Sequence, residues 1–372
     1  MKIRFPSALA VGLFVFGGAR AAAADPLDPA LERLVSSDTA ACRTSAGRYV
    51  PGTVSAAGMA ATCLPDNGAF ARLVNQWGFA LAPTAMHSAR TTGYGGFDLS
   101  IEANYTTISG NKDYWKSGTQ GELDPNTGQP LPINGSPPSL LQNYSLKFRK
   151  GFGFGLELTG IVGFVPQSSI VSGGADVRMS LLEGFRTGVG GVLPDVAVGA
   201  GVRTITGTSE FQLTTMGLDG QISKPFPIAG QSVLTPWLGY QYLFIWGDSG
   251  LIDLTPATDA IQACNYSGSA VPGNADPAKV DASGHPVYDG SPVCRGGQAY
   301  DFNNNSVFDP VRLRRHRLLA GVNYRYEMVM VGAQLIMDLV PPESAQYKQS
   351  AKEYLAGEDK QYSFVFELGA VF

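Results

Sequence analysis

The sequence contains few charged residues. Asp, Glu, Lys and Arg make up 16% of its 372 residues, against about 25% in a typical soluble domain. The formal net charge is −4. The chain has neither a basic arm nor a Gly-rich phosphate loop, so a nucleic acid is not an expected partner. After the first 24 residues, no apolar run is long enough to cross a membrane as a helix.

Residues that commonly bind metals or carry catalysis are also scarce. The three histidines are His87, His285 and His316. The sequence identifies no catalytic partner for any of them. There is no C-x-x-C motif and no His-rich cluster, so no metal or other cofactor is expected. An enzyme is therefore not predicted, and a hydrolase is the least favoured of the functions considered below.

The four cysteines fall into two neighbourhoods, Cys42 with Cys63 and Cys264 with Cys294. Pairing within each neighbourhood is the natural expectation, but four cysteines allow three connectivities and the sequence does not choose among them. In an exported chain, disulfides are the default expectation for paired cysteines. We therefore predict disulfide bonds at these four residues.

The first 24 residues have the pattern of a secretory signal peptide. Lys2 and Arg4 precede an apolar run over residues 8–16, and small residues then extend to Ala24. A basic start, a short apolar centre and a small-residue cleavage site are typical of export signals. The mature chain is expected to begin near Asp25. No cysteine stands at the cleavage point, so a lipid anchor is not expected.

Alternating side chains are abundant, and the last twelve residues show them most clearly. Tyr362, Phe364, Phe366, Leu368, Ala370 and Phe372 fall on one face, and Ser363, Val365, Glu367, Gly369 and Val371 on the other. A period of two predicts a strand. The aromatic face suits lipid and the mixed face suits a polar interior. The alternative is an ordinary strand of a soluble sheet.

This ending resembles the C-terminal strand of bacterial outer-membrane β-barrel proteins, which ends in Phe and is read by the barrel assembly machinery. The resemblance implies that this machinery is a partner and that the protein resides in the outer membrane.

Ten segments of the chain alternate in this way. They are residues 97–105, 143–149, 154–164, 175–181, 196–203, 215–222, 234–246, 317–326, 329–338 and 361–372. Twelve strands are possible, because the sixth segment is poorly patterned and the long loops can hide short strands. An even number is expected of a bacterial barrel in one chain.

The lengths of the connections alternate as well. Long connections (109–138, 167–174, 247–310 and 341–360, with a short one at 206–210) alternate with short ones near 150, 185–194, 224–231 and 327. Bacterial barrels have long extracellular loops and short periplasmic turns, whereas a secreted β-sandwich, the main rival fold, has no reason for this order. We predict an all-β, transmembrane, antiparallel up-and-down barrel over residues 93–372, with its longest extracellular loop at 247–310.

Residues 25–92 precede the first strand and contain two predicted helical pieces, at 29–35 and 68–79. Three interpretations remain open for this N-terminal segment. It can be a periplasmic cap, a plug folded into the lumen, or a partly ordered extension.

One face of the predicted strands carries charges of both signs, and we assign this face to the lumen. A salt-bridged filling of the barrel and a hydrated path for a solute are both consistent with it. Ten strands lie near the size at which side chains fill the interior, so a wide porin is not expected. The predicted lumen residues are Asp98, Glu102, Lys147, Arg149, Glu157, Asp176, Arg178, Arg203, Asp219, Arg317, Arg325, Asp338 and Glu367.

A dense basic cluster begins the eighth segment. Arg312, Arg314 and His316 share parity with the lipid-facing residues. At the outer end of the barrel they would meet the phosphorylated sugars of lipopolysaccharide, which arginine binds well. The alternative is a solvated run of charge at a strand end.

The favoured function is a narrow or gated channel or transporter for small solutes or hydrophobic compounds, with an N-terminal plug. The alternative is a structural or surface-interaction barrel that displays the loop at 247–310. A hydrolase of the outer membrane would need His316 beside a Ser or Asp from a neighbouring strand. The expected partners are outer-membrane lipids and lipopolysaccharide. The sequence fixes neither the solute nor the oligomeric state.

Overall fold

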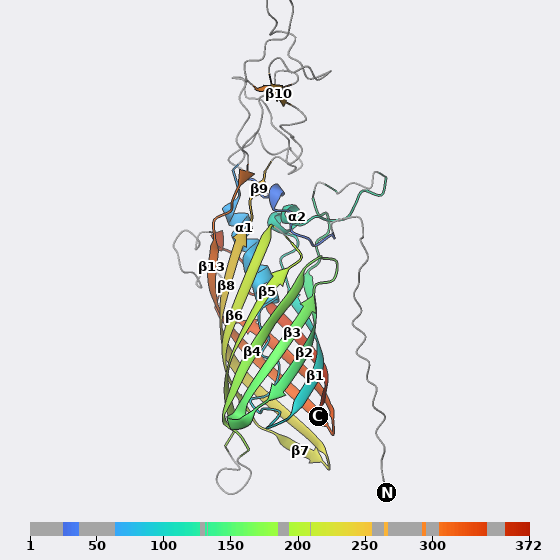
Figure 1. Ribbon diagram of the computed structural model, residues 1–372, viewed down its shortest axis with the longest axis vertical. Helices are drawn as coiled ribbons and strands as arrows, with labels where there is room; N and C mark the ends of the chain where they lie inside the picture. The colour runs from blue at the N-terminus through green and yellow to red at the C-terminus, as the bar shows by residue number, and fades with distance from the viewer. Residues whose placement is uncertain are drawn as a thin grey trace, which may run out of the picture.

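The computed structural model describes residues 25–36, 64–126, 131, 133–184, 193–208, 210–254, 264–266, 292–294, 305–340 and 354–372. Within these residues, ten long antiparallel strands form one closed ring (Figure 1). The order is β13-β14-β15-β1-β2-β3-β4-β5-β6-β8, and β8 pairs with β13 to close it. The prediction of an up-and-down barrel of about ten strands is therefore confirmed. The strands are β1 (Phe97–Thr107), β2 (Leu140–Gly151), β3 (Leu156–Phe164), β4 (Val171–Leu182), β5 (Asp195–Thr206), β6 (Phe211–Ser223), β8 (Ser232–Ser249), β13 (Val311–Tyr326), β14 (Val329–Asp338) and β15 (Tyr362–Val371).

The two faces of the strands differ as their alternation predicts. On β15, Phe364, Phe366 and Leu368 are exposed on the outside, whereas Ser363 and Glu367 are buried inside. The neighbouring strands repeat this pattern, since their exposed positions are mainly Leu, Val, Phe and Tyr. An apolar outer face and closed backbone pairing are what a sheet needs in order to stand in lipid.

The barrel has two different ends. The connections β1–β2, β3–β4, β5–β6, β8–β13 and β14–β15 lie at one end, which we call the loop end. The connections β2–β3, β4–β5, β6–β8 and β13–β14 lie at the other, which we call the turn end, together with the C-terminus and the short strand β7 (Phe226–Ala229) (Figure 1). The β13–β14 turn is tight, because Tyr326 pairs with Val329 and Glu327 has a positive φ of 52°.

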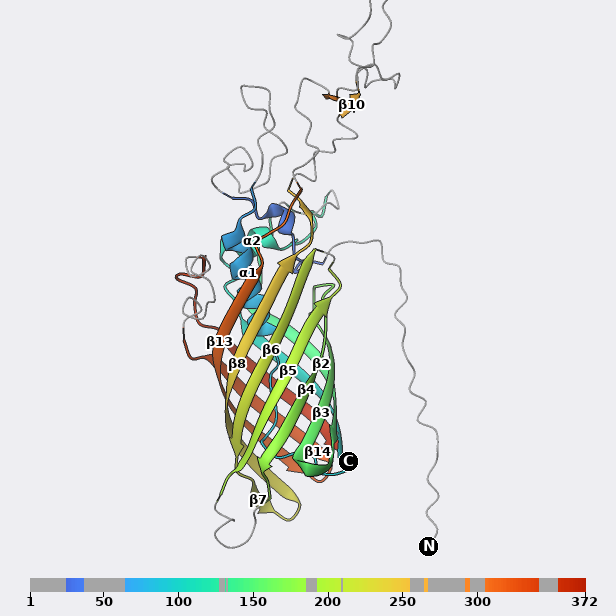
Figure 2. The same ribbon diagram turned by 60° about the vertical axis from the view of Figure 1, so that its left-hand side comes forward.

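The described part of the N-terminal segment lies at the loop end and inside the barrel (Figure 2). Helix α1 (Asn67–Ala80) begins at Asp66, whose side chain accepts a hydrogen bond from the Ala69 backbone N–H at 2.8 Å. Upstream, the Leu27 backbone N–H donates to the Gln167 carbonyl of the β3–β4 connection. The predicted helix at 29–35 is only a single 3-10 turn, η1 (Leu31–Arg33). No helix among the described residues is long and apolar enough to cross a membrane.

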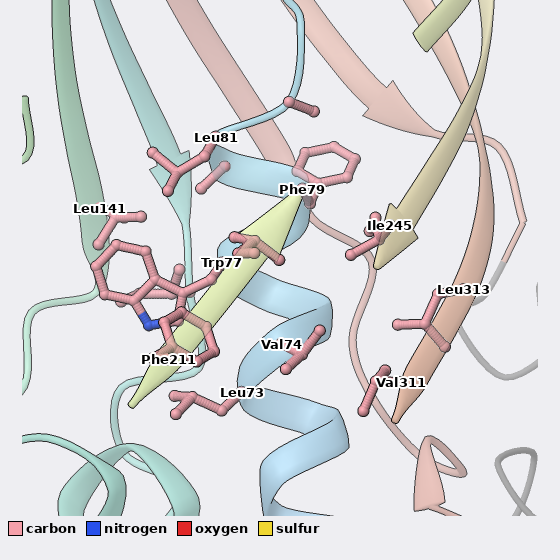
Figure 3. Close-up of a cluster of buried hydrophobic side chains, with 14 of the residues drawn as sticks. Leu73, Val74, Trp77, Phe79, Leu81, Leu141, Phe211, Ile245, Val311 and Leu313 are labelled. Carbon is pink, nitrogen blue, oxygen red and sulfur yellow. The ribbon is translucent and has the colours of Figure 1, made fainter. Parts of the chain in front are cut away.

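Helix α1 is buried on all sides. Close contact with β8 depends on two glycines, since a Cβ at Gly78 would overlap Ile245 and a Cβ at Gly247 would overlap Val74. Trp77 lies at the centre of the cluster in Figure 3, with its ring centroid 5.7 Å from that of Trp115. Trp115 belongs to a second short helix at the loop end, α2 (Asp113–Gly118).

The loop-end half of the lumen is apolar, which corrects the expectation of a polar interior throughout. The inward side chains around α1 include Phe211, Ile245, Val311 and Leu313, and all four are buried (Figure 3). The reason is that an apolar helix fills this half, so the wall that packs on it is apolar as well.

The cysteine predictions are only partly within the described residues. In a small hairpin formed by β10 (Cys264–Tyr266) and β11 (Pro292–Cys294), Cys264 is the register partner of Cys294. Directly opposite residues of an antiparallel pair have Cα atoms about 4.5–5.5 Å apart, a spacing that a disulfide can bridge. The bond itself stays a prediction. Cys42, Cys63, His285 and the predicted signal peptide at 1–24 lie outside the described residues.

Truncating the central side chain of α1 should loosen the helix without opening the ring of strands. We expect Trp77→Ala to lower the stability of the packed helix by about 3–5 kcal/mol, because it leaves a large cavity in the core. Hydrogen exchange of the α1 amides would measure this as faster exchange. Leu238→Ala, on the lipid-facing side of β8, is the control and should leave α1 protection unchanged. Equal protection in wild type and Trp77→Ala would contradict this account of the core.

Candidate functional site in the lumen

An extended segment, residues 81–92, follows α1 through the lumen to the start of β1 at the turn end. We call it the strap. Its carbonyl groups have no neighbouring strand, and buried carbonyls need hydrogen-bond donors. Inward side chains of the wall supply these donors. Among the described contacts, Gln241 donates to the Pro83 carbonyl (3.2 Å), Gln334 to Thr84 (2.8 Å), Gln221 to Ala85 (2.8 Å), Arg149 to Met86 (3.4 Å) and Arg178 to Ser88 (3.2 Å).

The end of α1 is held in the same way. A helix leaves its last carbonyls without internal partners and favours positive charge there. Asn104 donates to the Ala80 carbonyl at 2.9 Å, and Arg317 donates to the Phe79 carbonyl at 3.3 Å and also to that of Pro83. The guanidinium of Arg315 lies 4.4 Å from the centre of the Phe79 ring. Arg317 therefore joins the helix to the strap, and Arg315 holds the end of the helix.

Arg315 is a lumen residue that the sequence analysis missed. It is buried, donates to the Asn75 carbonyl at 3.2 Å and forms an ion pair with Asp338. It shares parity with Arg317, and that parity was the signal that could have identified it. We interpreted the basic cluster as a patch on the outer surface, and that interpretation uses Arg312 and Arg314, the residues near Arg315 that face outward.

The predicted lumen charges lie on the inward face, and all of them but one are buried or half-buried. Lys147 pairs with Glu102, Arg178 with Asp219 at 3.4 Å, and Arg203 with Asp176 at 2.6 Å. Glu102 also accepts a hydrogen bond from the Thr84 hydroxyl of the strap at 2.8 Å. Arg325 is the exception: it is exposed at the turn end, where its Nε donates to the Glu327 carbonyl at 2.8 Å. Asp98, Arg149, Glu157, Arg317, Asp338 and Glu367 are all buried in the lumen.

Near the turn end, three carboxylates share the guanidinium of Arg149. Atoms of the Arg149 guanidinium lie 3.6 Å from Asp98, 3.5 Å from Glu157 and 3.3 Å from Glu367. His87 of the strap places its Nε2 3.2 Å from a Glu157 oxygen. The three carboxylates outnumber Arg149, so negative charge exceeds positive charge around Arg149 whether or not His87 is protonated.

The strap also borders a cavity of about 400 Å³ at the turn end. Strap residues from His87 to Thr92 form one side of it, and β1, β2, β8, β13, β14 and β15 contribute the other. Its mouth includes the exposed residues Gln231 and Arg325, and Asp98 and Asn323 are buried in its wall.

Contacts at the loop end close the other side of the lumen. The Tyr114 hydroxyl of α2 donates to Glu358 at 2.6 Å, and the Gln76 amide of α1 donates to both residues. Burial raises the pKa of Tyr114 above its ordinary value, and its hydrogen bond to Glu358 raises it further. The hydroxyl therefore stays protonated and continues to act as a donor at neutral pH.

The basic cluster lies on the outer surface near the loop end, next to a column of aromatic residues on β8. Arg312 is the register partner of Trp246, Arg314 of Phe244 and His316 of Tyr242. The Arg314 guanidinium lies 6.0 Å from the Phe244 ring centre, and Arg312 pairs with Asp248 at 2.8 Å. The His316 ring hydrogen-bonds to the Tyr240 hydroxyl.

No group of three or more His, Cys, Asp or Glu residues that could hold a metal ion occurs among the described residues.

No protein-family model matches the chain, and no curated protein matches its sequence. Solved structures that align with it include Ail, the attachment invasion locus protein of Yersinia pestis (9% identity, TM-score 0.22, 75% of this chain and 99% of that one). KdgM porin aligns at 8% identity (TM-score 0.24, 73% and 99%) and the outer membrane protein Omp33 of Acinetobacter baumannii at 7% (TM-score 0.24, 76% and 99%). The closed ring of strands and its apolar outer face are the features of a sheet that stands in lipid. The chain is a β-barrel of the outer-membrane type.

The buried ion pair between Lys147 and Glu102 gives a direct test of the lumen network. Lys147→Met or Glu102→Gln alone should lower the free energy of unfolding by about 3–5 kcal/mol, because each leaves a buried charge without its partner. The double variant should lose less than the sum of the two single losses. Urea unfolding of the refolded barrel would measure all three. Arg312→Gln is the control, since an exposed pair contributes only about 0–1 kcal/mol; strictly additive losses would rule out the coupling.

Proposed function

We propose that the protein is a plugged channel of the outer membrane for small polar solutes, closed by α1 and the strap. The observation that carries this proposal is how the strap is held. It forms no strand pairing with the wall. Hydrogen bonds from polar side chains hold its carbonyls, one bond for most of them and two for the Pro83 carbonyl. Water can replace each of these bonds. The wall around it carries Lys147, Arg178 and Asp219, which suits a hydrated path once the strap has moved.

The helix keeps the path closed at rest. Phe70, Leu73, Val74, Trp77 and Phe79 are each fully buried. Burial of such side chains contributes about 1.5–3 kcal/mol each, so spontaneous loss of α1 from the lumen is rare. An opening of the whole lumen therefore needs an input that displaces the helix, such as a solute, a partner or a force.

Weakening the contact between α1 and β8 should open the barrel. Gly78→Leu forces a side chain into Ile245, and overpacking of this kind costs about 1–3 kcal/mol. We expect the wild type to be nearly silent in a planar bilayer. Openings of Gly78→Leu should be roughly ten- to a hundredfold more frequent. Leu238→Ala on the lipid face should behave as wild type.

A disulfide that locks the helix to the wall supplies the converse test. The Cβ of Val74 lies 3.1 Å from the position of a Cβ built at Gly247, a few tenths of an ångström from disulfide geometry. Adding Val74→Cys and Gly247→Cys to Gly78→Leu should abolish its openings, and a reductant should restore them. Gly78→Leu alone, given the same reductant, controls for the native cysteines. Silence of every variant would exclude gating by α1.

Such silence would favour the second candidate function, a structural or surface-interaction barrel. The dense apolar packing of α1 is the observation that supports it, because a permanently filled lumen also explains that packing. The connection between β8 and β13 would then be displayed at the loop end, which we expect to face the cell exterior.

We also propose that export by the signal peptide and assembly through β15 bring the protein to the outer membrane. In that membrane, we propose that the basic cluster binds lipopolysaccharide phosphates. Arg312 and Arg314 stand beside the aromatic side chains of β8 on the outer face. Arginine suits this role because its guanidinium forms bidentate hydrogen bonds with phosphate.

Replacing both Arg312 and Arg314 with Gln should reduce the lipopolysaccharide that co-purifies with the barrel by several fold. Phosphate analysis of the washed, detergent-purified protein would measure it. Arg325→Gln, at the turn end, is the matched control and should retain the wild-type amount. Unchanged lipopolysaccharide in the double variant would remove the proposal.

A further inference from the structure

The turn-end cavity combines an accessible mouth with buried polar groups that lack partners. At about 400 Å³ it falls in the size range of small-molecule sites. Asn323 is only 5% exposed, and neither its side-chain oxygen nor its nitrogen has a hydrogen-bond partner. Asp98 is fully buried, and both of its carboxylate oxygens lack one as well. Native proteins rarely leave such groups unsatisfied, and each exception calls for an explanation.

The charges around the cavity are separated along its depth. At the inner end, Asp98 and Arg149 line the cavity, and Glu157 and Glu367, which are not part of its lining, share Arg149 with Asp98. Arg90 also lines the cavity and pairs with Asp195 at 3.2 Å. At the mouth, Arg325 is exposed with its guanidinium held by the Glu327 carbonyl. The deep end therefore favours a positively charged hydrogen-bond donor, and the mouth favours an anion.

A simple anion, a simple cation and a neutral ligand each fail to match both ends of the cavity. A simple anion in the depth would face the excess of carboxylates, and a simple cation would leave Arg325 unused at the mouth. A neutral polyol would bring no positive charge to balance the excess of carboxylates around Arg149. A short molecule with an ammonium group at one end and a carboxylate at the other matches both ends.

We propose that the turn-end cavity is a binding site for a small zwitterion. Its ammonium group donates to Asp98 and to the side-chain oxygen of Asn323, and its carboxylate accepts from Arg325. Asp98 and Asn323 reach the ligand by rotating about χ2, a torsion that is broad for both residue types. The strap forms one side of the site, so the ligand contacts both the plug and the wall.

The test uses the full-length protein in detergent and four probes of matched small size: 4-aminobutanoate, butanoate, butylammonium and glucose. Isothermal titration or saturation-transfer NMR would measure binding. We expect 4-aminobutanoate to bind at least about tenfold more tightly than each of the others, a difference of about 1.4 kcal/mol. Asp98→Asn and Arg325→Gln should each weaken its binding by about tenfold.

Asn323→Leu keeps the design informative if Asp98→Asn does not fold. It replaces an unpartnered amide with an apolar side chain of similar size, so folding should be retained while binding weakens. Lys112→Gln and Asp113→Asn, which are exposed at the loop end, are matched controls that should bind as wild type does. No binding by wild type, equal binding of glucose, or unchanged binding in Arg325→Gln would each overturn the proposal. Binding is measured without a membrane, so the result is independent of whether the barrel conducts.

Discussion

The hydrogen bonds of the strap determine how the rest of the lumen is built. A chain that passes through a barrel in extended form cannot use strand pairing, and its peptide groups must still be satisfied. Here the donors come from six strands: β2, β4, β6, β8, β13 and β14 supply Arg149, Arg178, Gln221, Gln241, Arg317 and Gln334. Because each donor stands on a different strand, the strap is held along the axis and the strands are tied to one another through it.

The same constraint explains why the lumen has two unlike halves. A helix satisfies its own backbone hydrogen bonds, so the wall around α1 needs to supply only packing. From Leu81 onward the chain is extended and can no longer do this, and the inward positions change from Leu243 and Ile245 to residues such as Gln221 and Arg178. The change from apolar to polar wall thus follows the change from helix to strap. The charged side chains in the turn-end half of the lumen pair with each other around the strap, because burial removes them from water.

The sequence could predict the parts of this structure that depend on alternation, but not those that depend on what fills the barrel. Period two identified all ten strands and placed Glu102, Lys147 and Arg317 on the inward face. It did not place the N-terminal segment, because a helical pattern says nothing about which end of a barrel the helix enters. One signal of the apolar half was present. Residues 243–246, Leu-Phe-Ile-Trp, are apolar at both parities, and a strand that is apolar on both faces is buried on both. The deficit of positive charge around Asp98 could not be found either, because it depends on distances between strands that are far apart in the sequence.

In the proposed channel, the junction between helix and strap would decide how the barrel opens. Hydrogen bonds to the strap can be exchanged for water one at a time, so in the proposed channel a solute that enters from the turn end would displace the strap stepwise toward Leu81. Beyond that point each step would expose apolar side chains, and the helix has to leave as a unit. Arg315 and Arg317 stand at this boundary, bonded to carbonyls on the helix, while Arg317 also holds the strap at Pro83. Release of the strap removes one of the ligands that fix Arg317, and with it part of the charge that stabilises the end of α1. Arg317 therefore connects the two halves, and in the proposed channel a change at the turn end would alter the stability of α1 at the loop end.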